Sequence, residues 1–112
     1  MRPIGFDPKT QKPRMTEHAL TFGIRHLLNM HGIWHFKHWG GPLGEKGVAD
    51  IIGCHDGRMF AIEIKTEKGR VTPYQQRFID RVNDAGGLTF VARSIEDVTY
   101  YLGIGPRLKT NQ

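Results

Sequence analysis

Three side chains in the middle of the chain have the types and the spacing of a metal-assisted hydrolytic site. Asp50 is followed by twelve residues and then by Glu63, Ile64 and Lys65. Mg²⁺ prefers a few carboxylate oxygens, which Asp50 and Glu63 supply, and it also accepts a backbone carbonyl such as that of Ile64. Such an ion lowers the pKa of an attacking water and stabilises the charge that develops at a phosphate. A lysine beside it can orient the water or stabilise that charge. The spacing therefore predicts phosphodiester hydrolysis.

A β-hairpin is expected to hold these three residues. An apolar run at residues 48–52 and an alternating run at residues 59–65 flank residues 55–58, whose sequence HDGR is typical of a turn. Because successive side chains of a strand point to opposite faces, Glu63 and Lys65 share a face of the second strand. The aspartate of the neighbouring strand can then meet them at one cation.

An apolar setting separates this pattern from a common surface feature. Glu-x-Lys by itself usually marks a solvated strand face. Here Asp50 lies in an apolar run, and Glu63 lies among Phe60, Ile62 and Ile64 in a strand expected to be central. Two carboxylates buried together repel each other, which should raise the pKa of one of them, so a divalent ion should stabilise the fold. We expect Mg²⁺ or Mn²⁺.

The remaining periodicities predict helices packed around a sheet. The expected elements are a helix over residues 16–31, strands over 33–39, 48–52 and 59–65, a helix over 72–85, a strand over 88–92 and a helix over 94–102. Capping boxes, at Thr72 with Gln75 and at Ser94 with Asp97, are expected to begin the second and third helices. The order α-β-β-β-α-β-α predicts an α/β fold, a central mixed β-sheet flanked by helices.

Length and composition favour one folded intracellular domain. The 112 residues, 38% hydrophobic and 24% charged, suit a single domain over residues 16–104, between a basic, proline-containing arm (1–15) and a C-terminal tail (105–112). No apolar stretch approaches the roughly 20 residues of a membrane span, and the N-terminus has no apolar signal segment. The lone Cys54 excludes an internal disulfide and agrees with a reducing compartment. We therefore expect a cytoplasmic protein without membrane contact.

The charge balance favours a polyanionic partner. Sixteen Lys and Arg residues against eleven Asp and Glu residues give a net charge of +5, and the pI is about 9.7. Ribosomal proteins and membrane-surface binders share such a balance, so the motifs must decide. Lys46, Lys68, Arg70 and, in the arm, Arg14 are candidate phosphate contacts. Solvated loops and a loosely ordered terminus explain them equally well.

The sequence resembles the VRR-NUC family of the PD-(D/E)XK nuclease superfamily from about residue 16 to residue 102. The resemblance rests on Glu17, GVADIIG (47–53), DGR (56–58), AIEIK (61–65), Gly69 with TPYQ (72–75), Gly86-Gly87 and VARS (91–94). Ala49 stands where the superfamily motif has a proline, a departure at a position without chemistry.

This resemblance implies a metal-dependent DNA endonuclease with the PD-(D/E)XK core. It makes Asp50 and Glu63 metal ligands and Lys65 the catalytic lysine. Glu17 becomes an additional metal-site or water-linked carboxylate, and Gln75 becomes a site residue at the start of its helix. Stand-alone members of this size resemble Holliday-junction resolvases, which implies a homodimer acting on branched DNA such as junctions or flaps.

Several residues keep a second interpretation. Gln75 is equally suited to its capping box. Glu17 could instead interact with the dipole of its own helix, although the apolar neighbours of Glu17 suggest that it projects from the buried edge. Trp39, beside Gly40-Gly41, either packs in the core or stacks at a DNA junction. The whole fold could also serve as a DNA-binding module or accessory subunit that has lost its chemistry.

The histidines do not form a zinc motif. His31 and His35 straddle Gly32 and cannot share a helical face, and Cys54 has no CxxC partner. We expect His35 and His38 to lie in the core, on a dimer surface or in a DNA-facing loop.

Overall fold

The computed structural model describes residues 6–7, 12–13 and 15–105. Its elements are β1 (Phe6–Asp7), β2 (Lys12–Pro13), α1 (Glu17–Met30), β3 (His35–Lys37), β4 (Ile51–His55), β5 (Arg58–Ile64), α2 (Pro73–Asp84), β6 (Leu88–Ala92) and α3 (Ile95–Leu102). From α1 onward the expected order is confirmed. Most of the N-terminal arm, including Arg14, and the tail beyond Gly105 lie outside the described residues.

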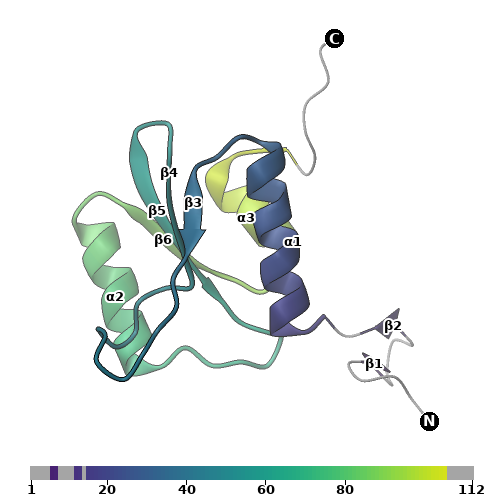
Figure 1. Ribbon diagram of the computed structural model, residues 1–112, viewed down its shortest axis with the longest axis horizontal. Helices are drawn as coiled ribbons and strands as arrows, with labels where there is room; N and C mark the ends of the chain where they lie inside the picture. Colours follow the sequence, from purple (N-terminus) through teal and green to yellow (C-terminus); the bar gives the residue numbers. More distant parts are fainter. Residues whose placement is uncertain (1–5, 8–11, 14, 106–112) are drawn as a thin grey trace.

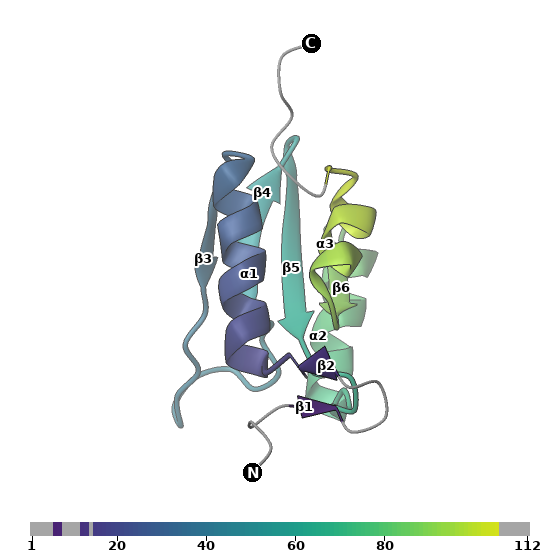
Figure 2. The ribbon, with the colours of Figure 1, turned by 90° about the vertical axis from the view of Figure 1, so that its right-hand side faces the viewer.

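A mixed four-stranded sheet forms the centre of the molecule. Its strand order is β3-β4-β5-β6, with antiparallel pairing between β3, β4 and β5 and parallel pairing between β5 and β6. Helices α1 and α3 lie on one face and α2 on the other (Figures 1 and 2). The predicted mixed sheet with flanking helices is therefore confirmed.

The hydrophobic core lies between the sheet and the helices α1 and α3. Phe60, Ile62 and Ile64 of β5 point into it, as their alternation predicts, and are at most 1% exposed. They pack with α1 (Leu20, Ile24, Leu27, Leu28), β6 (Phe90, Ala92) and α3 (Val98, Leu102). Each Leu, Ile, Val or Phe side chain among them contributes about 1.5–3 kcal/mol when it is fully buried. This packing fixes the start of α1 at the same end of the molecule as the end of β5 (Figure 2).

The β4–β5 hairpin is shifted relative to its predicted bounds. Asp56 and Gly57 form a two-residue turn with φ angles of 53° and 77°, the pattern of a type I′ turn. Strand β4 begins after Asp50 and β5 ends before Lys65, so both residues lie just outside the strands predicted to hold them. The Asp50 carboxylate accepts a hydrogen bond from the Ile64 N–H at 2.8 Å. This side-chain oxygen takes the place of the backbone carbonyl that an extended strand would offer to that N–H.

Strand β3 is also shorter than residues 33–39. It ends at Lys37, although the His38 N–H still donates to the Asp50 carbonyl at 2.7 Å. The glycine-rich segment that follows contains no helix or strand up to β4.

The predicted helix starts are confirmed at α2 and only half confirmed at α3. At α2 the Thr72 hydroxyl accepts from the Gln75 N–H, and the Gln75 side chain accepts from the Thr72 N–H. At α3 the Ser94 hydroxyl accepts from the Asp97 N–H, but the Asp97 carboxylate accepts from Arg93, one residue before the cap.

The helices are short. The longest, α1, has 14 residues, whereas a helix that spans a bilayer needs about 20. Within the described ranges, no helix is long and apolar enough to cross a membrane.

Candidate active site

Two carboxyl groups meet at the open end of the β4–β5 hairpin. Glu63 lies on β5, and Asp50 directly precedes β4. Because Ile51 pairs with Ile62, the next residues outward, Asp50 and Glu63, lie opposite each other on one face. The two carboxyl groups are close enough to share a hydrogen bond. The structure thus brings together the pair that the sequence predicts, although the Asp50 side chain is 22% exposed and lies at a bend rather than within a strand.

The Glu63 carboxyl group lacks the environment of an ordinary surface acid. Its residue is 3% exposed, and its Oε1 is a buried atom with no hydrogen-bond partner among the described residues. Burial is the largest cause that raises the Glu63 pKa from 4.5 to about 9; the hydrogen bond and the charge of Asp50 add to it, while Lys65 opposes it. The sequence predicts a raised pKa in this pair, but burial contributes more than the expected repulsion.

The Asp50 carboxylate has two neighbours besides Glu63. Its Oδ2 accepts the Ile64 N–H, and its Oδ1 lies 3.5 Å from the Nζ of Lys37, whose side chain is 15% exposed. Lys37 is a residue that sequence reasoning missed. A lysine within an aromatic strand is the available signal, but only the pairing of Lys37 with Ile51 places it beside Asp50.

Lys65 follows β5 directly and lies beside the carboxyl pair. Its positive charge lowers the pKa of Glu63, as expected for two residues on the same face. Its aliphatic stem packs on Gly69, where a Cβ would lie 3.3 Å from the Lys65 Cδ. The chain turn at Gly69 therefore helps to hold the lysine close to the carboxylates.

Glu17 is the first residue of α1, and it is exposed. The prediction that it projects from the buried edge of the helix is wrong, because Glu17 lies at the exposed end of α1, before Leu20 enters the core. Its charge nevertheless raises the pKa of Glu63, so it acts on the site electrostatically. It also occupies the first turn of α1, where an acidic side chain interacts favourably with the helix dipole.

The start of α2 lies against the loop that leads to Asp50. Gly47 has a φ of +81°, and a Cβ there would collide with the Tyr74 carbonyl and lie 2.8 Å from the Gln75 nitrogen. The Gln75 Oε1 accepts from the Thr72 N–H at 2.9 Å, which confirms its capping role. Gln75 is thus near the site loop, with its side-chain oxygen already engaged.

The donor set fits a hard divalent cation that keeps open coordination positions. Over the residues that the structure describes, no group of three or more His, Cys, Asp and Glu side chains is arranged to hold a metal. Asp50 and Glu63 supply two carboxylates, and the Glu63 Oε1 has no hydrogen-bond partner in the described part of the chain. Mg²⁺ is commonly held by one or two carboxylates with water completing its shell, so these residues suit it.

The central histidines engage in other contacts. The His31 Nε2 lies 3.0 Å from the Gly105 carbonyl. The His35 Nδ1 lies 3.0 Å from the Ile33 carbonyl, and its Nε2 accepts from Arg25 at 3.3 Å.

The candidate phosphate contacts are distributed over the surface near the start of α2. Lys46 is exposed and lies over the Tyr74 ring, 5.2 Å from its centroid. It shares a cavity of about 520 Å³ with Arg77 and Arg81, two cations that sequence reasoning did not single out. The expected candidates in the loop after β5, Lys68 and Arg70, are exposed, and Arg14 lies outside the described residues.

A cavity gives access to the carboxylate pair from solvent. It measures about 400 Å³ and is bounded by the glycine-rich loop before β4, with Lys37, Lys46 and Asp50 in its lining. The buried pair can therefore be reached at its Asp50 side.

Comparison with known proteins supports the fold. No family model matches the chain, and no curated protein matches it. A solved structure described as a "VRR_NUC domain protein" is similar, with a TM-score of 0.61 and 20% identity over 80% of this chain and 90% of that chain. At this identity the likeness is evidence of fold. The chain therefore shares the fold of that VRR_NUC domain protein, a mixed sheet with flanking helices, as its sequence predicts.

Proposed function

We propose that this chain is a Mg²⁺- or Mn²⁺-dependent nuclease that hydrolyses phosphodiester bonds in DNA. The observation that carries the proposal is the meeting of Asp50 with a buried Glu63 whose Oε1 has no partner among the described residues. Lys65 lies beside this pair, on a fold shared with a VRR_NUC domain protein. A buried, unsatisfied carboxyl group is unfavourable unless something binds it, and a cation is the natural ligand.

Each residue of the site then has a distinct task. Asp50 and Glu63 would hold the cation, with the Ile64 carbonyl as a further oxygen ligand. A bound cation would supply a water of lowered pKa and stabilise charge at the phosphate. Lys65 orients the attacking water or donates to the phosphate oxygens as their charge grows, and Glu17 holds a water at the edge of the site.

DNA as the substrate agrees with the charge of the protein. The net charge is +5, and Lys46, Arg77 and Arg81 gather around one cavity beside the start of α2. Such cations neutralise phosphates without regard to sequence. A preference for branched DNA, such as Holliday junctions or flaps, follows the expectation drawn from the VRR-NUC resemblance.

A homodimer would let two such sites cut two strands, and one sheet face is suited to it. Phe36 pairs with Ile52, and Cys54 pairs with Met59, so their side chains lie on the face opposite the core. On this side Trp34 is 65% exposed and Phe36 and Met59 are 42% exposed. Apolar side chains gathered on a solvent face are typical of association surfaces.

A second candidate function is a DNA-binding module without catalysis. The ion pair of Lys37 with Asp50 and the raised pKa of Glu63 favour it, because both reduce the negative charge that attracts a cation. If the cation bound only weakly, the protein would bind DNA through its fold and basic surface without cleaving it.

Cleavage assays separate the two functions. Purified protein with Mg²⁺ or Mn²⁺ should cut labelled duplex, flap or four-way junction DNA, and Asp50→Ala and Lys65→Ala should each lower the rate at least about a hundredfold. Binding measured in EDTA should persist in both variants. Asp84→Ala, which removes an exposed acid at the end of α2, serves as the control and should cut normally. Binding without any cleavage by the unaltered protein would favour the module.

The dimer is tested separately by light scattering. The unaltered chain should show twice its own mass, and Trp34→Asp should show a single chain because a charge in an apolar interface is unfavourable. A strict monomer would remove the junction-resolving version of the proposal and leave the nuclease site intact.

A further inference from the structure

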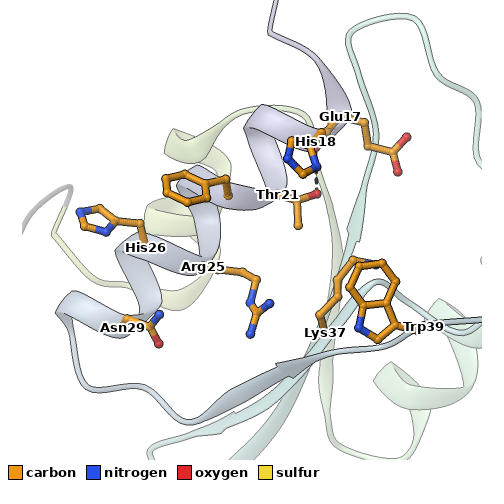
Figure 3. A pocket seen from close by; sticks show the side chains of 9 residues that line it. Glu17, His18, Thr21, Arg25, His26, Asn29, Lys37 and Trp39 are labelled. Carbon is orange, nitrogen blue, oxygen red and sulfur yellow. Dashed lines mark hydrogen bonds between the residues drawn. The ribbon is translucent and has the colours of Figure 1, made fainter.

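A cavity beside the candidate site is lined by both aromatic and cationic side chains. It lies between the outer side of α1 and the end of β3 and measures about 620 Å³ (Figure 3). This volume is within the range of about 300–1,000 Å³ found for sites that hold small organic ligands. Phe22 and Arg25 contribute to one wall, and Lys37 and Trp39 form the other. Aromatic and cationic side chains therefore line one open cavity.

Trp39 is unusually exposed for a tryptophan. It is 79% exposed, so the interpretation of this residue as core is wrong. One side of its ring is occupied by Lys37, whose Nζ lies 4.7 Å from the ring centroid. This cation–π contact holds the indole in place. Much of the indole surface remains free for a flat ligand.

Arg25 supplies a positive charge that no carboxylate of the described residues neutralises. It extends from α1 toward β3 (Figure 3), where its Nε donates to the His35 Nε2 at 3.3 Å. Within the described part of the chain, Arg25 forms no salt bridge with any carboxylate. A guanidinium anchored through one nitrogen keeps its other N–H groups available for a phosphate.

The cavity adjoins the one at the proposed cleavage site. Lys37 lines this cavity and also the one that contains Asp50, and its Nζ lies 3.5 Å from the Asp50 Oδ1. At the other edge Glu17 lines the cavity, and its charge acts on Glu63. A DNA strand that enters the cavity would therefore pass beside the carboxylate pair.

We propose that this cavity binds an unpaired nucleotide of single-stranded DNA next to the bond that is cut. The base stacks on Trp39, and the phosphate contacts Arg25. A free aromatic face suits an unstacked base, which single strands present and duplexes do not. The inference rests on the proposed nuclease function and makes it specific: the preferred substrate has a single-stranded branch or tail that begins at the cleavage site.

Fluorescence tests the contact directly, without metal or cleavage. Trp34 and Trp39 are the two tryptophans of the chain, so Trp34→Phe leaves Trp39 as the reporter. Titration with oligo-dT in EDTA should quench its emission to saturation, and Arg25→Gln in the same background should weaken the binding severalfold. Absence of saturable quenching would overturn the inference.

Affinity for tailed and blunt DNA tests the preference. By fluorescence anisotropy in EDTA, the unaltered protein should bind a duplex with a short single-stranded tail more tightly than the same duplex with blunt ends. Trp39→Ala should reduce that ratio at least about fivefold, and Trp39→Phe should restore most of it. Tyr100→Ala is the matched control, since Tyr100 is also 79% exposed but lies on α3, and it should leave the ratio unchanged.

The outcomes distinguish this inference from the proposed function. Metal-dependent cleavage with a tailed-to-blunt ratio that Trp39→Ala does not alter would overturn the inference alone. Saturable oligo-dT quenching without cleavage in Mg²⁺ or Mn²⁺ would support the cavity and contradict the nuclease.

Discussion

The two ends of the β4–β5 hairpin follow different rules. At the closed end Asp56 and Gly57 both have positive φ angles, as a type I′ turn requires, and Asp-Gly is a favoured sequence for it. At the open end Asp50 leaves the strand, and Glu63 is buried with an unpaired oxygen. At the closed end the sequence agrees with the local structure. The open end departs from local structural preferences, as functional sites often do.

Glycines at the two ends allow the largest test of this difference. Gly47 and Gly57 have similar φ angles of +81° and +77°, but a Cβ at Gly47 meets the α2 backbone, whereas a Cβ at Gly57 meets nothing within 4 Å. Gly47→Ala adds a steric collision to the backbone strain and should lower the free energy of unfolding by about 3 kcal/mol or more. Urea denaturation measures it.

The control for Gly47→Ala is in the same loop. A Cβ at Gly40 has nothing within 4 Å, and its φ is not positive, so Gly40→Ala should change the stability by less than about 0.5 kcal/mol. Equal effects of the two substitutions would mean that the loop does not pack on α2 as described.

Glu63→Gln should remove a pH dependence that originates at the open end. In the metal-free protein the folded-state pKa of Glu63 is about 9 against 4.5 for the ordinary group. Its stabilising contribution is thus complete below pH 4.5 and is lost as the pH rises toward 9, because the unfolded chain ionises first. In EDTA the melting temperature of the unaltered protein should fall over this range by at least about 4 °C more than that of Glu63→Gln. Parallel pH profiles would contradict a protonated, buried Glu63.

Gly57→Ala should have a smaller effect that does not involve the site. A side chain at positive φ costs roughly 1–2 kcal/mol, and no collision adds to it. Thermal unfolding should therefore show a modest loss of stability, while any Mn²⁺-induced rise in melting temperature should keep its size. A reduced Mn²⁺ effect would show that the two ends of the hairpin are coupled.

The capping box of α2 provides the smallest expected effect. Thr72→Ala removes the oxygen that accepts from the Gln75 N–H and should cost about 1 kcal/mol. Thr72→Ser keeps that acceptor and should cost less than half as much. If Thr72→Ala lowers the cleavage rate by much more than this loss of stability explains, Gln75, which Thr72 holds in place, has a second task at the site.

Local patterns were sufficient to predict much of the fold. Alternation identified β5 and its core face, and the sequence bounds of β6, residues 88–92, are those observed. The turn at Asp56-Gly57 and the cap at Thr72 were also recognisable, because each depends on residues that are adjacent in the chain. The meeting of Asp50 and Glu63 followed from the hairpin.

Features that depend on tertiary placement could not be predicted in this way. Lys37 reaches Asp50 only through the register of β3 with β4. The exposure of Glu17 and of Trp39 depends on how α1 and β3 sit relative to each other, which their own sequences do not specify. The Asp97 carboxylate accepts from the backbone N–H of Arg93 instead of that of Ser94, because these two amides compete for one carboxylate.

Anomalous diffraction from crystals soaked in Mn²⁺ tests the central claim most directly. We predict one strong manganese peak between the carboxyl groups of Asp50 and Glu63, at about 2.1 Å from an oxygen of each, and loss of that peak in Glu63→Gln. A manganese ion bound elsewhere, with no peak between these two carboxyl groups, would contradict the account.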